Sequence, residues 1–304
     1  MKANSFLIVL VPVVLLTAVF LMPDAIYKKT EKIAEIKSEK LRIVSLAPSV
    51  TEMLFSMGLG DAVVGITDYC DYPPQTKNIQ HVGGFAMPNI EKILKLHPDL
   101  VITADDKRRE ILRPLEQSGI RILNLTIKSF EDIFKAFRQI GQATNHIPQA
   151  QTIINRMQED LKSLVQKYHF NDIPNSQRPK VFMEIWHDPV TTVGRSSIIN
   201  ELIQLAGGVN VAQDVSGMYP NISPEKVIEW KPDVIIVCYM TPKQQNKMQM
   251  GSRIGWQDIP AVINNRAYSD IPRDLILRPG PRMVDGVRML AEHLYGHQYH
   301  DTPK

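Results

Sequence analysis

The chain has 304 residues, of which 44% are hydrophobic and 22% are charged. This composition excludes intrinsic disorder and a multi-pass membrane protein, and the length is sufficient for two domains. The 35 lysines and arginines and the 32 acidic residues are too evenly balanced for a protein that holds nucleic acid by neutralising phosphates, so no nucleic-acid partner is expected. Two cysteines without a CxxC pair, Cys70 and Cys238, support neither a zinc finger nor a disulfide scaffold, and whether they pair stays open.

The N-terminal residues contain an uncharged apolar run at 6–22. Its length lies between that of a secretory apolar region, about 7 to 15 residues, and that of a membrane span, about 20 residues. The sequence therefore leaves open whether residues 1–27 are a cleaved signal peptide or an uncleaved membrane anchor. In both cases the body of the protein is expected to be periplasmic, outside the cytoplasmic membrane. Residues 28–40 are highly charged and are expected to form a solvated linker.

From residue 41 onward, short β-branched runs alternate with amphipathic stretches. The predicted strands lie at 42–47, 63–66, 99–103, 121–125, 180–186 and 233–239. Strands that alternate with helical patterns are typical of an α/β fold with mainly parallel sheets.

Between the two groups of strands, apolar residues recur at helical spacing over 146–168. Thr144 or Asn145 is placed to cap this helix, and Pro148 suits its first turn. Such a long helix can cross from one lobe to another. The sequence therefore predicts an N-terminal α/β lobe, a bridging helix and a C-terminal α/β lobe, with bounds at 41–145, 146–170 and 171–299.

One motif occurs twice. EKILKLHPDLVI begins at Glu91 and EKVIEWKPDVII begins at Glu225, 134 residues later. Each copy predicts a short helix, a Pro-Asp turn and a buried strand, and a period of about half the chain indicates two related lobes. The two glutamates would then occupy equivalent positions. Because helix, Pro-Asp turn and strand is a common succession in α/β proteins, a chance match is the alternative.

Catalytic motifs are missing from the sequence. It contains no Gly-Lys dipeptide and hence no Walker loop, no GxSxG and no HExxH. An enzyme of the nitrogenase-like two-lobe type would need more cysteines than two to hold its cofactor. The sequence therefore predicts a protein that is not an enzyme, with neither a metal site nor a cofactor of its own.

Aromatic residues gather in predicted loops at the carboxyl ends of strands, where open α/β sheets bind ligands. They are Tyr69 and Tyr72 in TDYCDYPP, Phe85 in VGGFAMP, Trp186 and His187 in EIWHDP, and Tyr219 in GMYPNIS. Flat rings on turns that glycine or proline stiffens suit a large, flat, partly apolar ligand. For each ring taken singly, core packing is the alternative, and Tyr72, which two prolines follow, is the ring most expected to be structural.

Four strings occur in order: RIVSLAPSVTEMLFSMGLGDAVVGITDYCDYPP, HVGGFAMPNIEKILKLHPDLVI, TTVGRSSIINELIQLAGGVN and YPNISPEKVIEWKPDVIIV. Through them, residues 41 to 296 resemble the periplasmic substrate-binding proteins of ABC importers for vitamin B12, siderophores and haem, most closely the cobalamin-binding type. The resemblance implies a monomer of two α/β lobes joined by one rigid helix, with the ligand in the cleft between them. It also implies capture of cobalamin or a related corrinoid and delivery to an ABC transporter permease with its ATPase subunits. A ferric siderophore or haem is the alternative ligand, with Tyr69 or His187 available to haem iron.

The resemblance also assigns ligand-binding residues. Tyr69 and Phe85 match two N-lobe aromatics that face a bound corrin ring, although the second is tryptophan in the cobalamin binder. Tyr219 matches a C-lobe aromatic at the cleft, while Trp186 and His187 fall in a cleft loop where the family varies.

Arg278 and Arg282, in RPGPR, fall in a loop that resembles the C-lobe edge of the cleft and can donate to amides or carboxylates. An ordinary helix-start arginine is an equal alternative for Arg282, because Pro281 fits a first turn.

Glu91 and Glu225 match the paired glutamates that such proteins present to arginines of a two-subunit permease. An exposed pair of this kind contributes about 0–1 kcal/mol, so these residues would fix orientation more than affinity. Two solvated helix-start glutamates are the alternative. A tethered receptor that signals without feeding a permease is a further rival, which an uncleaved anchor would permit.

Overall fold

The computed structural model describes residues 41–104, 109–239 and 253–300. The predicted signal peptide or anchor at 1–27 and the predicted linker at 28–40 lie outside these described residues. Within the described ranges, no helix is both long enough and apolar enough to span a membrane.

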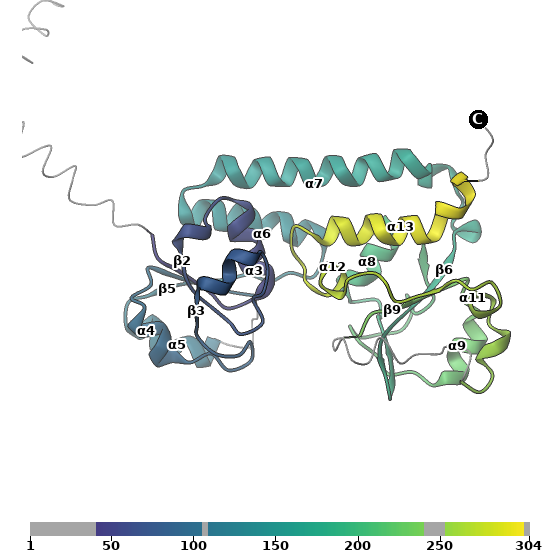
Figure 1. The fold of residues 1–304 in the computed structure, drawn as a ribbon, viewed down its shortest axis with the longest axis horizontal. Helices are drawn as coiled ribbons and strands as arrows, with labels where there is room; N and C mark the ends of the chain where they lie inside the picture. Colours follow the sequence, from purple (N-terminus) through teal and green to yellow (C-terminus); the bar gives the residue numbers. More distant parts are fainter. Residues whose placement is uncertain (1–40, 105–108, 240–252, 301–304) are drawn as a thin grey trace, which may run out of the picture. The chain divides into compact units, whose positions relative to one another are not determined.

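The first sheet has five parallel strands in the order β3-β2-β1-β4-β5 (Figure 1). Its strands are β1 (Ile43–Ser45), β2 (Val63–Ile66), β3 (Gln80–His81), β4 (Leu100–Thr103) and β5 (Arg121–Asn124). Its helices are α3 (Pro48–Ser56), α4 (Ile90–Lys95), α5 (Arg109–Gln117) and α6 (Phe130–Thr144). Every residue of β1 and β4 is buried, as expected for central strands of a parallel sheet that helices cover on both faces. This sheet and its helices form the N-terminal lobe.

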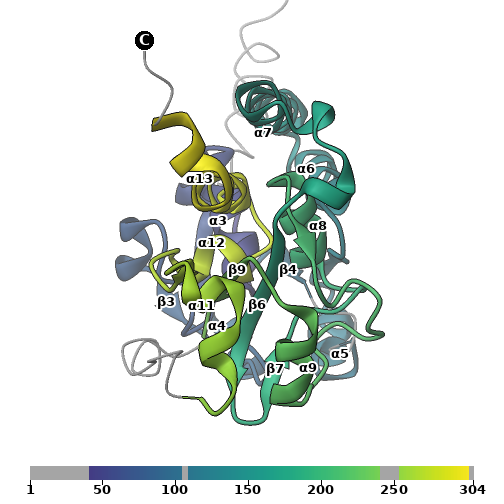
Figure 2. The same cartoon turned by 90° about the vertical axis from the view of Figure 1, so that its right-hand side faces the viewer.

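The second sheet runs in the order β10-β9-β6-β7, with β8 also paired to β6. Its strands are β6 (Lys180–His187), β7 (Val190–Thr192), β8 (Val209–Asn210), β9 (Val234–Val237) and β10 (Ala267–Tyr268). Its helices are α8 (Ile198–Leu205), α9 (Pro224–Trp230), α11 (Pro260–Ile263), α12 (Arg273–Leu277) and α13 (Met283–His300). All its strand pairs are parallel except the β6–β7 hairpin. Figure 2 shows α13 at the top of this C-terminal lobe and α9 beside the strands in its lower half.

The helix α7 (Ile147–Tyr168) connects the two lobes and packs against α6 and α13 (Figure 1). Pro148 lies in its first turn, as the sequence predicted. The predicted caps are wrong: Asn145 has a φ of 60° and ends α6 instead, and the Thr144 hydroxyl donates to Ile140 O of that same helix. The predicted fold class, two α/β lobes joined by a single long helix, is confirmed.

The duplicated motif makes the same backbone contacts in both lobes. The Asp99 carboxylate accepts the N–H of Arg42 at 2.8 Å, and the Asp233 carboxylate accepts the N–H of Lys180 at 2.8 Å. The N–H of Asp99 in turn donates to Arg42 O, and the N–H of Asp233 donates to Lys180 O, each at 2.9 Å. The Pro-Asp turn therefore fixes the start of the first strand of each sheet, and the two copies are structurally equivalent.

Candidate functional site

The Tyr69 cavity is a hollow of about 520 Å³ with walls from both lobes, a size typical of small-molecule sites. The N-terminal lobe contributes Ala47, Pro48, Ser49, Tyr69, Phe85, Ala86 and Ala104, and the C-terminal lobe contributes Leu277, Arg278 and Pro279. The N-lobe residues follow the carboxyl ends of the parallel strands β1, β2, β3 and β4. Ligands of open α/β sheets bind at this edge.

A hydrogen bond between loops holds the two aromatic residues of this cavity near each other. The N–H of Asp68 donates to Gly83 O at 3.0 Å, which ties the loop of Tyr69 to the loop of Phe85. Gly83 has a φ of 103°, and a Cβ there would lie 3.1 Å from backbone atoms of the same loop. Tyr69 is 62% exposed, whereas Phe85 is half-buried against the core, so the tyrosine ring is the freer of the two.

The guanidinium of Arg278 forms the charged edge of the Tyr69 cavity, and its side chain is only 13% exposed. Its Nη1 donates to Asp71 Oδ1 at 2.6 Å and lies 3.4 Å from Glu52 Oε1. Its Nε lies 3.2 Å from Asp274 Oδ1, and its Nη2 lies 3.5 Å from Tyr69 O. Burial lowers the pKa of Arg278, but the bond to Asp71 and the nearby carboxylates outweigh it and raise the pKa.

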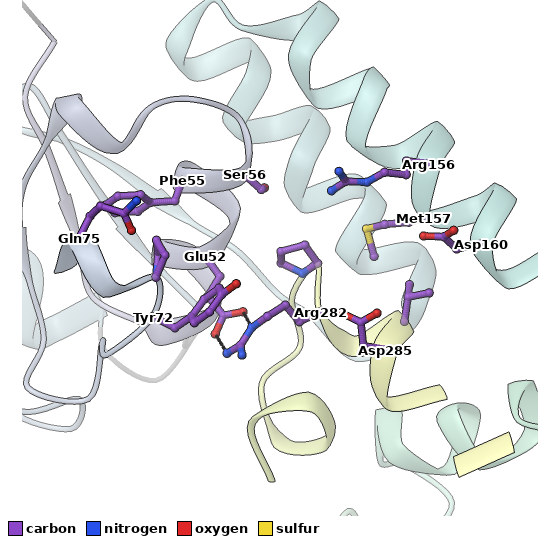
Figure 3. Close-up of a pocket in the computed structure, with 13 residues that line it drawn as sticks. Glu52, Phe55, Ser56, Tyr72, Gln75, Arg156, Met157, Asp160, Arg282 and Asp285 are labelled. Atoms are coloured by element: carbon purple, nitrogen blue, oxygen red, sulfur yellow. Dashed lines mark hydrogen bonds and ion pairs between the residues drawn. The ribbon is translucent and has the colours of Figure 1, made fainter. Parts of the chain in front are cut away.

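Arg282 faces a second hollow, the Arg156 cavity, of about 550 Å³ (Figure 3). Its Nε donates to Glu52 Oε2 at 2.8 Å and its Nη2 donates to Glu52 Oε1 at 2.5 Å. The guanidinium also lies over the ring of Tyr72, 3.7 Å from its centroid. Tyr72 is therefore a platform for Arg282, and Arg282 belongs to an ion pair between the lobes and not to the wall of the Tyr69 cavity.

The Arg156 cavity lies between α3, α7 and the start of α13. Its lining residues are Glu52, Phe55, Ser56, Tyr72, Pro73, Gln75, Arg156, Met157, Asp160, Pro281, Arg282, Val284 and Asp285. Figure 3 shows the paired Glu52 and Arg282 at one side of it and Asp160 with Asp285 at the other. Glu52 thus lies between the two cavities: Arg278, its partner on one side, lines the Tyr69 cavity, and Arg282 lines the other.

The remaining predicted ligand residues stand apart from the Tyr69 cavity. Trp186 and His187 lie at the end of β6, where Trp186 Nε1 donates to Asp188 O at 2.9 Å. Tyr219 follows in a loop of the same lobe, and burial raises its pKa while a hydrogen bond to Ser197 partly offsets that rise. None of the three lines the Tyr69 cavity as described.

Tyr219 nevertheless has a counterpart in the first lobe. It comes two residues after Gly217, whose φ is 96°, just as Phe85 comes two residues after Gly83, whose φ is 103°. The spacing between the two sites is the 134 residues of the duplicated motif. The repeat therefore begins before Glu91 and Glu225 and places one aromatic residue, Phe85 or Tyr219, at the same position of each lobe. The matched sequence strings, which begin at the two glutamates, did not include this relation.

Glu91 and Glu225 are each the second residue of a short helix, α4 and α9. Asn89 and Ser223 cap these helices by accepting the N–H groups of Lys92 at 2.9 Å and Lys226 at 3.3 Å. Both glutamates are exposed, and neither contacts a partner within the described residues. The two glutamates therefore occupy equivalent, exposed positions at the starts of capped helices.

The two cysteines are free and buried. Burial raises the pKa of the Cys70 thiol, and it raises the pKa of Cys238 to about 12. Within the described part of the chain, no group of three or more His, Cys, Asp and Glu side chains has the arrangement of a metal site.

Sequence reasoning missed Glu52 and Asp71. A signal for Glu52 exists: it is the one charged residue in PSVTEMLFS, and a lone carboxylate on a buried helix needs an ionic partner. No comparable signal exists for Asp71, because its partner Arg278 lies 207 residues away in the sequence.

Residues 43–273 match the sequence profile of a protein family that is described as periplasmic binding protein. A Bacillus subtilis protein named as the ABC transporter substrate-binding lipoprotein YvrC is 33% identical over 265 residues, covering 86% of this chain and 82% of that protein. The structure of the periplasmic vitamin B12 binding protein BtuF of Vibrio cholerae matches with a TM-score of 0.71 and 30% identity, over 84% of this chain and 97% of BtuF. The periplasmic heme-binding protein RhuT from Roseiflexus matches with a TM-score of 0.70 and 25% identity, over 84% of this chain and 98% of RhuT.

Proposed function

This chain belongs to the periplasmic binding protein family, the non-enzymatic substrate-binding proteins of ABC importers, and we propose that it captures cobalamin or a related corrinoid outside the cytoplasmic membrane. It delivers this ligand to an ABC transporter permease, as a monomer. Residues 6–22 tether it to the membrane if they are not cleaved.

The observation that carries the proposal is the composition of the Tyr69 cavity. Two aromatic residues and a set of small or aliphatic residues face it, and its one charged lining residue among those described is Arg278. A corrin is a broad, partly apolar ring, so most of its face is satisfied by apolar and stacking contacts. The similarity to the vitamin B12 binding protein BtuF supports the same ligand class.

A second candidate, haem or a ferric siderophore, is favoured by one feature. The Tyr69 ring is exposed at the cavity, and a tyrosine oxygen can coordinate ferric iron. The similarity to RhuT supports this alternative. His187, the other predicted iron ligand, lies at the end of β6 and not in the cavity lining.

A binding titration decides between the ligands. The full-length protein is titrated with cyanocobalamin, haemin and a ferric siderophore, following intrinsic fluorescence and the absorbance of each ligand. The proposal expects nanomolar binding of cyanocobalamin, about −12 kcal/mol, and much weaker binding of the other two. Tight binding of haemin or siderophore alone would contradict the corrinoid and leave the transport role intact, while no binding of any of the three would contradict ligand capture itself.

Substitutions locate the ligand. Tyr69→Ala and Phe85→Ala should each weaken cobalamin binding about three- to tenfold, because a stacked ring contributes about 0.5–1.5 kcal/mol. Tyr72→Ala is the matched control, since Tyr72 is in the same loop but lines the Arg156 cavity. Trp186, His187 and Tyr219 stay predicted contacts of the C-terminal lobe. Alanine at each should weaken binding if that lobe approaches the ligand.

Glu91 and Glu225 are the proposed docking residues for the permease. Their equivalent, capped and exposed positions support two equivalent contacts with a two-subunit partner. Glu91→Gln and Glu225→Gln should leave cobalamin affinity unchanged and reduce transport, with the double variant lower than either single one. Glu229→Gln, on the same helix as Glu225 but paired with Lys226, serves as the control. Unchanged transport in the double variant would favour a receptor that signals without a permease.

A further inference from the structure

The arginine of the Tyr69 cavity has carboxylates at two of its three nitrogens. Asp71 and Glu52 are near Nη1, at 2.6 and 3.4 Å, and Asp274 is near Nε, at 3.2 Å. The third nitrogen, Nη2, lies 3.5 Å from a backbone carbonyl, Tyr69 O. Each nitrogen of Arg278 therefore already faces an acceptor from the protein itself.

The charges of this neighbourhood cancel. Glu52 is shared with Arg282 at 2.5 Å, and Asp274 also lies 3.6 Å from Arg273. The three arginines, Arg273, Arg278 and Arg282, thus face the three carboxylates of Glu52, Asp71 and Asp274. A ligand carboxylate that approached this edge would meet no net positive charge and would have to share Nη1 with Asp71, whereas binding of an uncharged edge does not depend on a free positive charge at the guanidinium.

The three carboxylates differ in how far a ligand can reach them. The Glu52 side chain is 1% exposed and therefore buried, and that of Asp274 is 28% exposed and therefore only partly open to solvent. The Asp71 side chain is 60% exposed and makes the shortest contact with Arg278. Asp71 is therefore the carboxylate that a ligand can displace, and the one whose removal frees a guanidinium nitrogen while Glu52 and Asp274 still hold the arginine in place.

On the basis of the proposed ligand capture, we infer that Asp71 is a specificity-determining residue: it occupies Arg278, so that the cavity favours planar ligands with uncharged edges over those with peripheral carboxylates. Asp71 acts through Arg278 and is a positioning residue. It sets the charge that the cavity presents and leaves the stacking surface of Tyr69 and Phe85 unaltered.

The test uses ligand pairs that share a ring and differ in charge. Haemin is compared with its dimethyl ester, and cyanocobalamin with the acid in which one side-chain amide is hydrolysed to a carboxylate. The full-length wild type and Asp71→Asn are titrated with both pairs at low and high salt. Asp68→Asn is the matched control, because Asp68 is in the same loop and is 53% exposed, against 60% for Asp71, but contacts His81 at 3.2 Å instead of Arg278.

Asp71→Asn should tighten binding of the carboxylate member about ten- to hundredfold relative to its uncharged partner, the size of one hydrogen bond to a charged group. High salt should reduce this gain, since part of it is Coulombic. Asp68→Asn should keep the wild-type ratio, and Asp71→Glu, which restores the charge, should return the ratio to the wild-type value.

An unchanged ratio in Asp71→Asn, or an equal gain for both members of each pair, would overturn the inference. Because the haemin pair and the cobalamin pair each report the ratio independently, the inference holds or fails for whichever ring binds. Failure of the wild type to bind any of the four ligands would be a different result, which overturns the proposed function and the inference with it.

Discussion

Replacement of Arg282 by methionine tests how the protein tolerates a carboxylate in its interior. The Glu52 side chain is 1% exposed, and Arg282 supplies its two close partners, at 2.8 and 2.5 Å. Removing one member of a buried ion pair typically destabilises a protein by about 3–5 kcal/mol, because the other charge is left without compensation. Arg278 remains 3.4 Å from Glu52, so we expect a loss of about 3 kcal/mol, at the lower end of that range.

The measurement is urea unfolding of the full-length protein, with the midpoint and the slope both recorded. Arg195→Met is the control, because Arg195 pairs with Asp214 at 3.1 Å and both side chains are exposed. That pair should contribute less than about 1 kcal/mol. A loss below about 1 kcal/mol for Arg282→Met would refute the reasoning, since the Glu52 carboxylate would then be solvated or neutral without its partner.

The reciprocal substitution, Glu52→Gln, should lower the free energy of unfolding by less than Arg282→Met does. The difference between the two losses is part of the same test. In Glu52→Gln the unpaired group is Arg282, whose side chain is 21% exposed and still rests on the Tyr72 ring. Its charge can reach water, whereas the Glu52 carboxylate cannot. Equal losses for the two substitutions would mean that exposure does not control the cost.

Three further predictions follow from single features of the fold. Asn89→Ala and Ser223→Ala should each lower the free energy of unfolding by about 1 kcal/mol, because each removes an equivalent helix cap; a loss for only one of them would contradict the equivalence of the repeats. Cys70 and Cys238 should both resist Ellman's reagent at pH 8 in the native protein and react after unfolding in urea, because burial raises the pKa of both thiols, so fast native labelling of either would contradict the structure. Hydrogen bonding to Arg278 lowers the pKa of Asp71, so this carboxylate stabilises the protein above the ordinary aspartate pKa of about 3.9 and ceases to do so as the pH falls through the lowered value. The Tm deficit of Asp71→Asn should thus be equal at pH 7 and pH 5 and shrink below about pH 4, and a deficit that disappeared near neutral pH would contradict this assignment.

The fold is predictable where the pattern is long. The period of apolar residues over 146–168 is sustained for six turns, and the helix Ile147–Tyr168 follows it closely. The capping error arose because Asn145 suits both a helix start and a left-handed helix end, and only the tertiary structure selects the second. The two-residue strands β3, β8 and β10 were missed because two residues carry no alternation.

The site is predictable only in part, for a physical reason. Tyr69 and Phe85 follow strand ends, so topology alone brings them to one edge of the sheet, and the structure places both in one cavity with Arg278. The Glu52–Arg282 pair joins residues 230 positions apart, and local sequence contains no information on which charges of two lobes will face each other. From the sequence, Arg282 was interpreted either as a ligand-binding residue or as an ordinary arginine at a helix start. The structure shows a third role, in an ion pair between the lobes.

Two of the connections between the lobes, the helix α7 and the Glu52–Arg282 pair, bear on how the cavity meets its ligand. The helix α7 packs against α6 of one lobe and α13 of the other, and the Glu52–Arg282 pair joins α3 to the start of α13. A widening of the Tyr69 cavity that moved α3 away from the loop of Arg278 and Arg282 would break the contacts of 2.5 and 2.8 Å between Glu52 and Arg282. The loss of these contacts should destabilise the protein by about 3 kcal/mol, as expected for Arg282→Met. An open form is then populated at less than about 1%. The cavity is then preformed, and ligand binding need not supply the free energy of a wide closure.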